Sequence, residues 1–234
     1  MSFRTRASKT PAQARLAEVV ASYIQHLLLM QANFAECTLD ANVIPPPNDK
    51  FPSHDFFCAT RTPPISIEKY TDHLITYMHC SPEVFMFALA YLRRLVLAGF
   101  PVHSRSIHRL LLTAVLVALK CRDDLYYHVS FYAKVGGVTP KDLCIMEIRF
   151  LSDLIHFECE VSVAEYQTVV HGITRVTRCS MAKSISDISD LSSQGGLSAG
   201  TSTTSTPEEV IALHEIDVSF APLWASECQI YPGV

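Results

Sequence analysis

Residues 104–121 read SRSIHRLLLTAVLVALKC, and they hold the longest apolar run of the chain. From Leu110 to Leu119 only Thr113 interrupts this run. It is too short to span a lipid bilayer, which requires about 20 apolar residues in a helix. We therefore interpret the stretch as a helix buried on all sides, and we expect an all-α domain in which other helices pack around it.

Helix start signals recur on both sides of this run, as capping residues and as prolines of the first turn. Ser81-Pro82-Glu83 is one such signal, and Ser162 with Glu165 forms a capping box. Gly136-Gly137 ends a short helix, so we interpret it as a helix C-cap rather than as a phosphate cradle. The helices predicted in this part of the chain span 66–79, 81–97, 104–121, 128–135, 139–156 and a stretch that opens at 162.

Segments of different composition flank this helical domain. Residues 11–33 carry apolar residues at helical spacing, which predicts an amphipathic helix. Ser, Gly and Thr dominate the region after the last domain helix, a composition that cannot build a core. The predicted divisions are 1–62 for the N-terminal helix and a Pro-rich linker, 63–178 for the helical domain, 179–205 for a disordered linker, and 206–234 for a short C-terminal helix and a tail.

Composition argues against several classes of function. The net charge is −4, and the Lys and Arg residues are scattered, so we expect neither nucleic acid nor a membrane as a partner. The eight cysteines form no C-x-x-C pair, and no apolar segment of a signal peptide follows Met1, which favours an intracellular location in the cytoplasm or nucleus. His79-Cys80 and His156 with Cys159 do not build a four-ligand set, so we predict no metal site and no cofactor. No catalytic constellation stands out.

Glu147 is the informative polar residue. On a helical wheel of 139–156 it falls within the apolar face, which consists of Leu143, Met146, Phe150, Leu154 and Phe157. A buried carboxylate is costly unless it is paired, protonated or directed at a partner. An internal ion pair and a partner-binding role therefore both remain open for Glu147.

Lys120 is the natural counter-charge because it closes the most apolar helix. On that helix it shares the less apolar stripe with Arg105, Arg109, Thr113 and Leu116, the edge that we expect to reach solvent or a partner. The alternative is a cation that is favourable merely because it lies at a helix C-terminus.

Several runs closely resemble, in order and spacing, the single-box cyclins of the yeast phosphate pathway and the plant P-type (U-type) cyclins. The resemblance covers roughly 60–172, and the run Tyr132-Ala133-Lys134-Val135-Gly136-Gly137-Val138 is its specific part. The other matching runs are Ile65 to Tyr70, His108 to Ala114, Lys120 with Asp123-Asp124, and Met146-Glu147 with Phe150-Leu151. The resemblance implies a five-helix cyclin box around a buried central helix, here 104–121, with an additional N-terminal helix.

The resemblance also implies a function without catalysis. Such a chain is a regulatory subunit that forms a heterodimer with a cyclin-dependent Ser/Thr kinase and activates it by fixing its C-helix in the active position. By motif position, Lys120 and Glu147 hold backbone groups of the kinase, and Asp124 lies near its activation segment. The apolar neighbours that the resemblance assigns to the kinase contact are Leu116, Val117, Cys121 and Leu151. The alternative is a cyclin-fold adaptor for a protein partner that is not a kinase.

Overall fold

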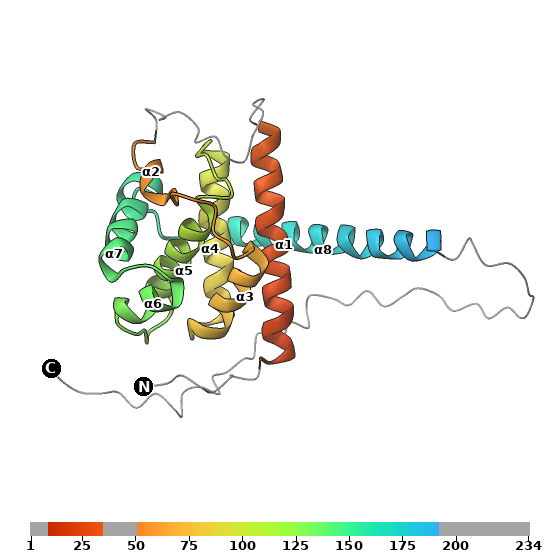
Figure 1. Cartoon of the computed structure of the whole chain (residues 1–234), viewed down its shortest axis with the longest axis horizontal. Coiled ribbons are helices and arrows are strands. Elements are labelled where there is room, and N and C mark those ends of the chain that lie inside the picture. The colour runs from red at the N-terminus through yellow and green to blue at the C-terminus, as the bar shows by residue number, and fades with distance from the viewer. Residues whose placement is uncertain (1–8, 35–50, 192–234) are drawn as a thin grey trace, which may run out of the picture. The chain divides into compact units, whose positions relative to one another are not determined.

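The computed structural model describes residues 9–34 and 51–191, in which helices joined by loops and turns are present and no strand occurs (Figure 1). The all-α prediction is thereby confirmed. The described residues up to Ser184 belong to one unit; of the second unit, which begins at Ile185, only the end of the last helix is described. The helices are α1 (Pro11–Phe34), α2 (His54–Phe57), α3 (Ile67–Tyr77), α4 (Pro82–Leu97), α5 (Ile107–Arg122), α6 (Val129–Gly136), α7 (Pro140–Arg149), the π-helix η1 (Phe150–Leu154) and α8 (Val163–Leu191).

Helix α5 lies at the centre of the first unit. From Ile107 to Leu119 every residue except Arg109 is buried, which confirms the buried helix predicted from the apolar run. Helix α4 packs along α5, and α2, α3, α6 and α7 also contact it (Figure 1). The stripe expected to reach solvent is mostly buried as well: Thr113 and Leu116 are fully inaccessible, so only the Arg109 and Lys120 positions remain partly exposed.

Helix α1 confirms the amphipathic helix predicted over 11–33. Its apolar face packs against α3 and α4, which lie beside it in Figure 1. The large buried residues of this face are Val20, Tyr23, Ile24 and Leu27. The helix therefore extends the core of the domain rather than standing apart from it.

Most of the predicted caps are present. The Ser66 hydroxyl accepts from the Lys69 amide, and Ser162 and Glu165 form the reciprocal pair of a capping box. Ser81 differs, because its side chain makes no cap hydrogen bond. Its hydroxyl and amide instead donate to the two carboxylate oxygens of Asp123, at 2.7 and 3.0 Å, and tie the start of α4 to the end of α5.

The helix predicted over 139–156 is present, but it changes type near its C-terminal end and stops at Leu154. Helix α7 ends at Arg149, and a π-helical turn follows it. His156 and Phe157 then adopt positive φ angles of 50° and 61°, which turns the chain away. Phe157 is 69% exposed and so lies outside the apolar face to which the helical wheel assigned it.

The linker predictions need two corrections. Helix α2 lies in the region predicted to be irregular. Helix α8 continues to Leu191, so helix covers the first part of the predicted linker 179–205. The rest of that linker and the C-terminal helix predicted within 206–234 lie outside the described residues.

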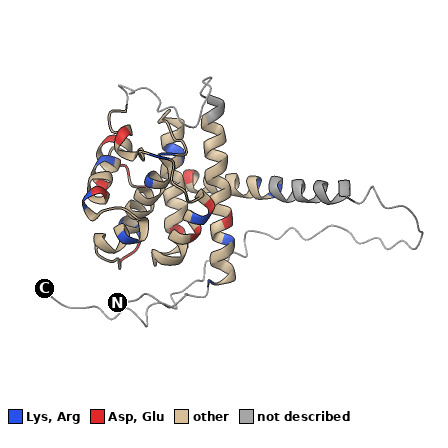
Figure 2. Ribbon diagram, viewed as in Figure 1, with Lys and Arg blue, Asp and Glu red and all other residues tan. Residues whose placement is uncertain are grey.

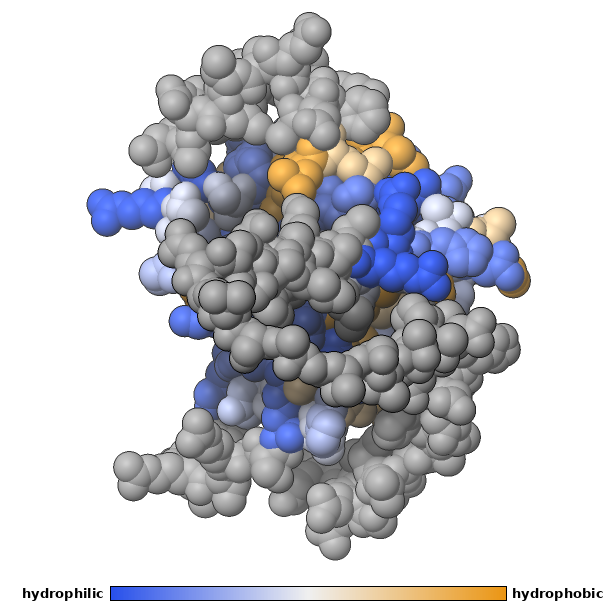
Figure 3. Space-filling model, turned by 90° about the vertical axis from the view of Figure 1, so that its right-hand side faces the viewer, coloured by the Kyte–Doolittle hydropathy of each residue, from blue (hydrophilic) through white to orange (hydrophobic). Residues whose placement is uncertain are grey.

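The described surface is mixed in charge and hydropathy. Lys and Arg alternate with Asp and Glu over the domain rather than gathering on one face (Figure 2). The described atoms of the face in Figure 3 are mainly hydrophilic, with apolar side chains in small patches. None of the described helices is both long enough and apolar enough to cross a membrane.

The two glycines after α6 have different roles. Gly137 is the left-handed C-cap of the helix, with φ 71°, as predicted. Gly136 lies against α5, where a Cβ atom would come within 2.2 Å of Leu112 Cδ2. Its carbonyl also accepts from the Tyr70 hydroxyl at 3.1 Å. Gly136 thus allows α6 to pack closely on the central helix, and Gly137 ends α6.

We expect Gly136→Ala to lower the free energy of unfolding by about 1–3 kcal/mol, because the added methyl group overpacks against Leu112. Gly137→Ala should cost about 1 kcal/mol through backbone strain alone. Gly137→Asn is the matched control and should cost less, because Asn tolerates the left-handed region better. Urea unfolding followed by circular dichroism measures all three, and wild-type stability of Gly136→Ala would contradict the close approach.

An ion pair joins α4 to the start of α8. Arg94 donates to both carboxylate oxygens of Glu165, at 2.7 and 2.9 Å, and to the Glu158 carbonyl at 2.6 Å. The hydrogen bonds from Arg94 lower the pKa of Glu165 from 4.5 to about 2. Because the folded-state pKa is depressed, this stabilisation is complete above pH 4.5 and is lost as the pH falls towards 2.

We expect Glu165→Gln to lower the free energy of unfolding at neutral pH by about 1 kcal/mol, since solvent screens a pair that is a quarter to a third exposed. The variant should also lose less stability than the wild type between pH 4.5 and pH 2. Urea titrations at a series of pH values measure both effects. Glu160→Gln, at an exposed side chain, is the control, and parallel pH profiles of wild type and Glu165→Gln would refute the assignment.

Candidate functional site

Lys120 and Glu147 form an ion pair at the surface. Lys120 closes α5, and Glu147 lies in α7, which packs on α5. The Lys120 Nζ atom is 2.6 Å from Glu147 Oε1. The side chains retain 27% and 14% of their exposure, so the pair is partly buried and still accessible to a partner. The structure thus brings together the two charged residues that the sequence singled out.

The apolar residues assigned to the same site lie at two depths. Leu116 and Val117 are buried, with 0% and 2% exposure, so they support the end of α5 from below and do not lie on the surface. Leu151 is partly exposed, and Cys121 is exposed. Partial burial of the Cys121 thiol and the neighbouring Cys159 thiol raise the pKa of Cys121 to about 11, which keeps it neutral at neutral pH.

The two acids after α5 have separate roles. Asp123 receives both hydrogen bonds from Ser81 and is therefore part of the framework. Asp124, the residue that the sequence singled out, is exposed. Its position in the turn leaves its carboxylate available to a partner.

Sequence reasoning missed part of the surface around Glu147. Ile148 follows Glu147 in α7 and is 63% exposed, and Cys144, one turn earlier, is also exposed. Both residues lie outside the buried face of α7, which consists of Leu143, Met146 and Phe150. The helical wheel could have shown this. Helix α7 lies on the side opposite to the face shown in Figure 3.

A second group of side chains meets elsewhere in the domain, namely His54, Cys58 and His103. These three residues differ from His79-Cys80 and from His156 with Cys159, on which the prediction of no metal site rested. The spacing of His54 and Cys58, four residues apart, was a usable signal, because helical residues at this spacing share one face. The distant His103 could not be found without the tertiary structure.

Comparisons with known proteins agree with the helical arrangement. Residues 9–159 match the family model for Cyclin. Cyclin-U4-1 of Arabidopsis thaliana is 42% identical over 102 residues, which make up 43% of this chain and 50% of that protein. Cyclin-U1-1 of the same plant is 35% identical over 156 residues, or 65% of this chain and 73% of that protein. Cyclin-P3-1 of rice (Oryza sativa subsp. japonica) is 37% identical over 120 residues, covering 51% and 48%.

The chain therefore belongs to the cyclin family, and the resemblance seen in the sequence to plant P-type and U-type cyclins is confirmed. The chain spans about half the length of several of these relatives, and 73% of Cyclin-U1-1. The likeness to the yeast phosphate-pathway cyclins stays a prediction.

We expect a double-mutant cycle of Lys120→Ala and Glu147→Ala to give a coupling free energy of about 0.5–1 kcal/mol in the unbound chain, because water still reaches the pair. Unfolding in urea measures each variant. Combining Lys120→Ala with Glu18→Ala in α1 is the control, and those two effects should add. A coupling of zero between Lys120 and Glu147 would show that the pair does not form in solution.

Proposed function

We propose that this chain is a regulatory subunit that binds and activates a cyclin-dependent Ser/Thr kinase. The observation that carries the proposal is the partly buried ion pair of Lys120 and Glu147, held at 2.6 Å by two helices of the core. Membership of the cyclin family supports the same role. The chain itself contributes no catalytic group.

The geometry suits a docking surface for a polypeptide backbone. A lysine ammonium group donates hydrogen bonds and a carboxylate accepts them, so the pair can bind a carbonyl and an amide of the partner together. Because each charge already has a counter-charge nearby, neither is left unpaired in the free chain. Leu151, Cys121 and Ile148 can supply the apolar area around the pair.

The rigidity of the site favours selection of one kinase conformation. Leu116 and Val117 are packed in the core below Lys120, so the end of α5 cannot adapt to different partner shapes. A kinase is active when its C-helix glutamate pairs with its catalytic lysine. A rigid surface that binds the C-helix only in that position shifts the population towards the active state. Asp124, which is exposed and follows Lys120 by four residues, would lie near the activation segment of the kinase.

We expect Lys120→Ala and Glu147→Ala each to weaken the complex with the kinase at least about tenfold, as for residues at the centre of an interface. Glu147→Lys should weaken it more, because it places two like charges side by side. Affinity purification of the full chain with mass spectrometry identifies the kinase, titration of the purified subunits gives the affinities, and phosphorylation of a protein substrate measures activation.

Lys69→Ala and Glu18→Lys are the matched controls, since both residues are exposed on α3 and α1, away from α7. They should leave binding unchanged. Stoichiometric recovery of the kinase with Glu147→Lys would rule out this surface. Recovery of a partner that is not a kinase, lost in the same variant, would support instead the adaptor role that the sequence left open.

A further inference from the structure

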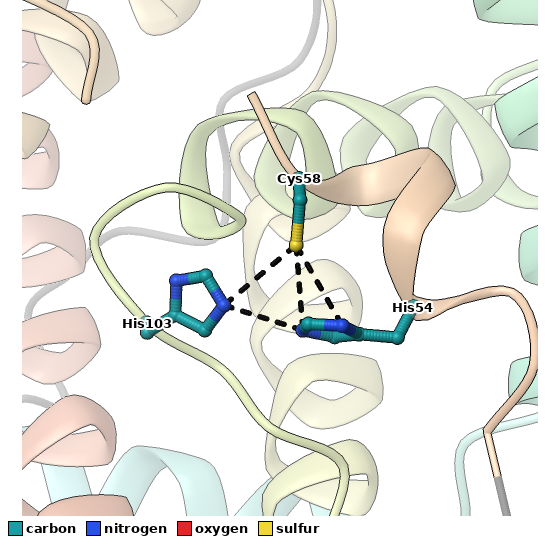
Figure 4. Close-up of side chains that lie close together, drawn as sticks. All are labelled: His54, Cys58 and His103. Carbon is teal, nitrogen blue, oxygen red and sulfur yellow. Dashed lines mark hydrogen bonds between the residues drawn. The ribbon is translucent and has the colours of Figure 1, made fainter. Parts of the chain in front are cut away.

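Three side chains that can ligate a metal ion meet where α2 lies against the loop before α5 (Figure 4). His54 lies in α2, Cys58 directly follows α2, and His103 lies in the loop. The Nε2 atoms of the two histidines are 3.2 Å apart. Cys58 Sγ is 3.4 Å from Nε2 of His54 and 3.7 Å from Nε2 of His103. We propose that this cluster is a zinc site with three protein ligands and a fourth position open to water.

The triangle of donor atoms has the dimensions of a zinc site. Zinc binds imidazole nitrogen at about 2.0–2.1 Å and thiolate sulfur at about 2.3 Å, in tetrahedral geometry. Those bond lengths place two nitrogen ligands about 3.3–3.4 Å apart, and a nitrogen and a sulfur about 3.5–3.6 Å apart. Each observed edge differs from its expected length by no more than about 0.2 Å. Cys58 Sγ also lies 3.7 Å from His54 Nδ1, so the sulfur faces the imidazole ring (Figure 4). The His54 ring must therefore turn for its Nε2 lone pair to point at an ion held among the three atoms.

The backbone on both sides of the cluster is held in place without a metal. The Ala59 amide donates to the Arg105 carbonyl at 2.9 Å, and the Arg105 guanidinium donates back to the Ala59 carbonyl at 3.0 Å. Phe57 is fully buried, and its ring packs against those of Phe100 and Phe150. The ligands thus lie on a fixed frame with apolar side chains behind them, as is typical of metal sites.

The surroundings of the two imidazoles differ. The Nδ1 atom of His54 lies 3.6 Å from Asp55 Oδ1. A carboxylate beside one ring nitrogen orients an imidazole that ligates through the other. The Arg105 amide donates to His103 Nδ1 at 3.2 Å, so in the free protein the His103 proton is on Nε2. Zinc at Nε2 requires that proton on Nδ1, and this hydrogen bond is then lost.

The donor set selects the kind of metal. Two imidazoles and a thiolate suit zinc and other late transition metals, whereas magnesium and calcium prefer oxygen ligands. The thiol proton of Cys58 passes to water when the thiolate binds. The thiolate then offsets one charge of the ion. Among the charged groups beside the cluster, the Asp55 carboxylate favours a cation, and the Arg105 and Arg109 guanidinium groups oppose it.

The test starts from the full chain after removal of metals by a chelator. We expect isothermal titration to give about one bound zinc ion per chain, as three ligands on one frame imply. Cobalt should bind in the same place and produce absorption bands of a tetrahedral ion with a thiolate-to-cobalt charge-transfer band. Magnesium and calcium should produce no binding.

Variants then locate the ion. Cys58→Ser and His103→Gln should each weaken zinc binding more than about 100-fold, and Cys58→Ser should remove the charge-transfer band. Cys144→Ser and His171→Gln, at exposed positions of α7 and α8, are matched controls and should bind as the wild type does. Circular dichroism checks that each variant is folded, and zinc should raise the melting temperature of the wild type and the controls only.

Two results would overturn the zinc site. One is the absence of stoichiometric zinc and cobalt binding by the wild type, which would leave the cluster as hydrogen-bonded side chains. The other is wild-type binding by a folded Cys58→Ser variant. Neither measurement uses a kinase, so the outcome is independent of the function proposed above.

Discussion

The burial of α5 on every side is the constraint on which the rest of this domain depends. A helix that is apolar all round must be covered all round, because exposed apolar surface costs free energy in proportion to its area. Helices α2, α3, α4, α6 and α7 provide that cover. The glycine at position 136 follows from the same demand, because α6 reaches Leu112 only where no side chain intervenes.

The candidate site arises where this burial ends. Lys120 is the first charged residue of α5 after its apolar run, and its ammonium group emerges beside α7. Glu147 meets it there because the buried face of α7, formed by Leu143, Met146 and Phe150, holds that helix on the core. The charges are consequently placed by packing, while their own attraction contributes little to stability. A pair fixed in this way presents one geometry to a partner.

The sequence allowed Glu147 to be found by physical reasoning, since a carboxylate on an apolar face needs an explanation. The prediction of Lys120 as a site residue depended more on the resemblance to cyclins, because a lysine at the end of a helix is common. The burial of Leu116 and Val117 agrees with the central helix predicted from the apolar run, whereas the resemblance assigned both residues to the kinase contact. The cluster of His54, Cys58 and His103 was missed because α2 is a single turn, held by aromatic rings that come from distant parts of the chain.

By itself the sequence determined the all-α class, the central helix, most helix starts and the family, because these follow from local capping chemistry, from apolar periodicity and from specific motifs. Only the tertiary structure decided where α7 gives way to a π-helical turn, that Ser81 binds Asp123, and that His103 joins His54 and Cys58, which lie 49 and 45 positions earlier along the chain. Those features depend on contacts between segments far apart in sequence. Helical periodicity describes one segment at a time and contains no information about which segments will touch.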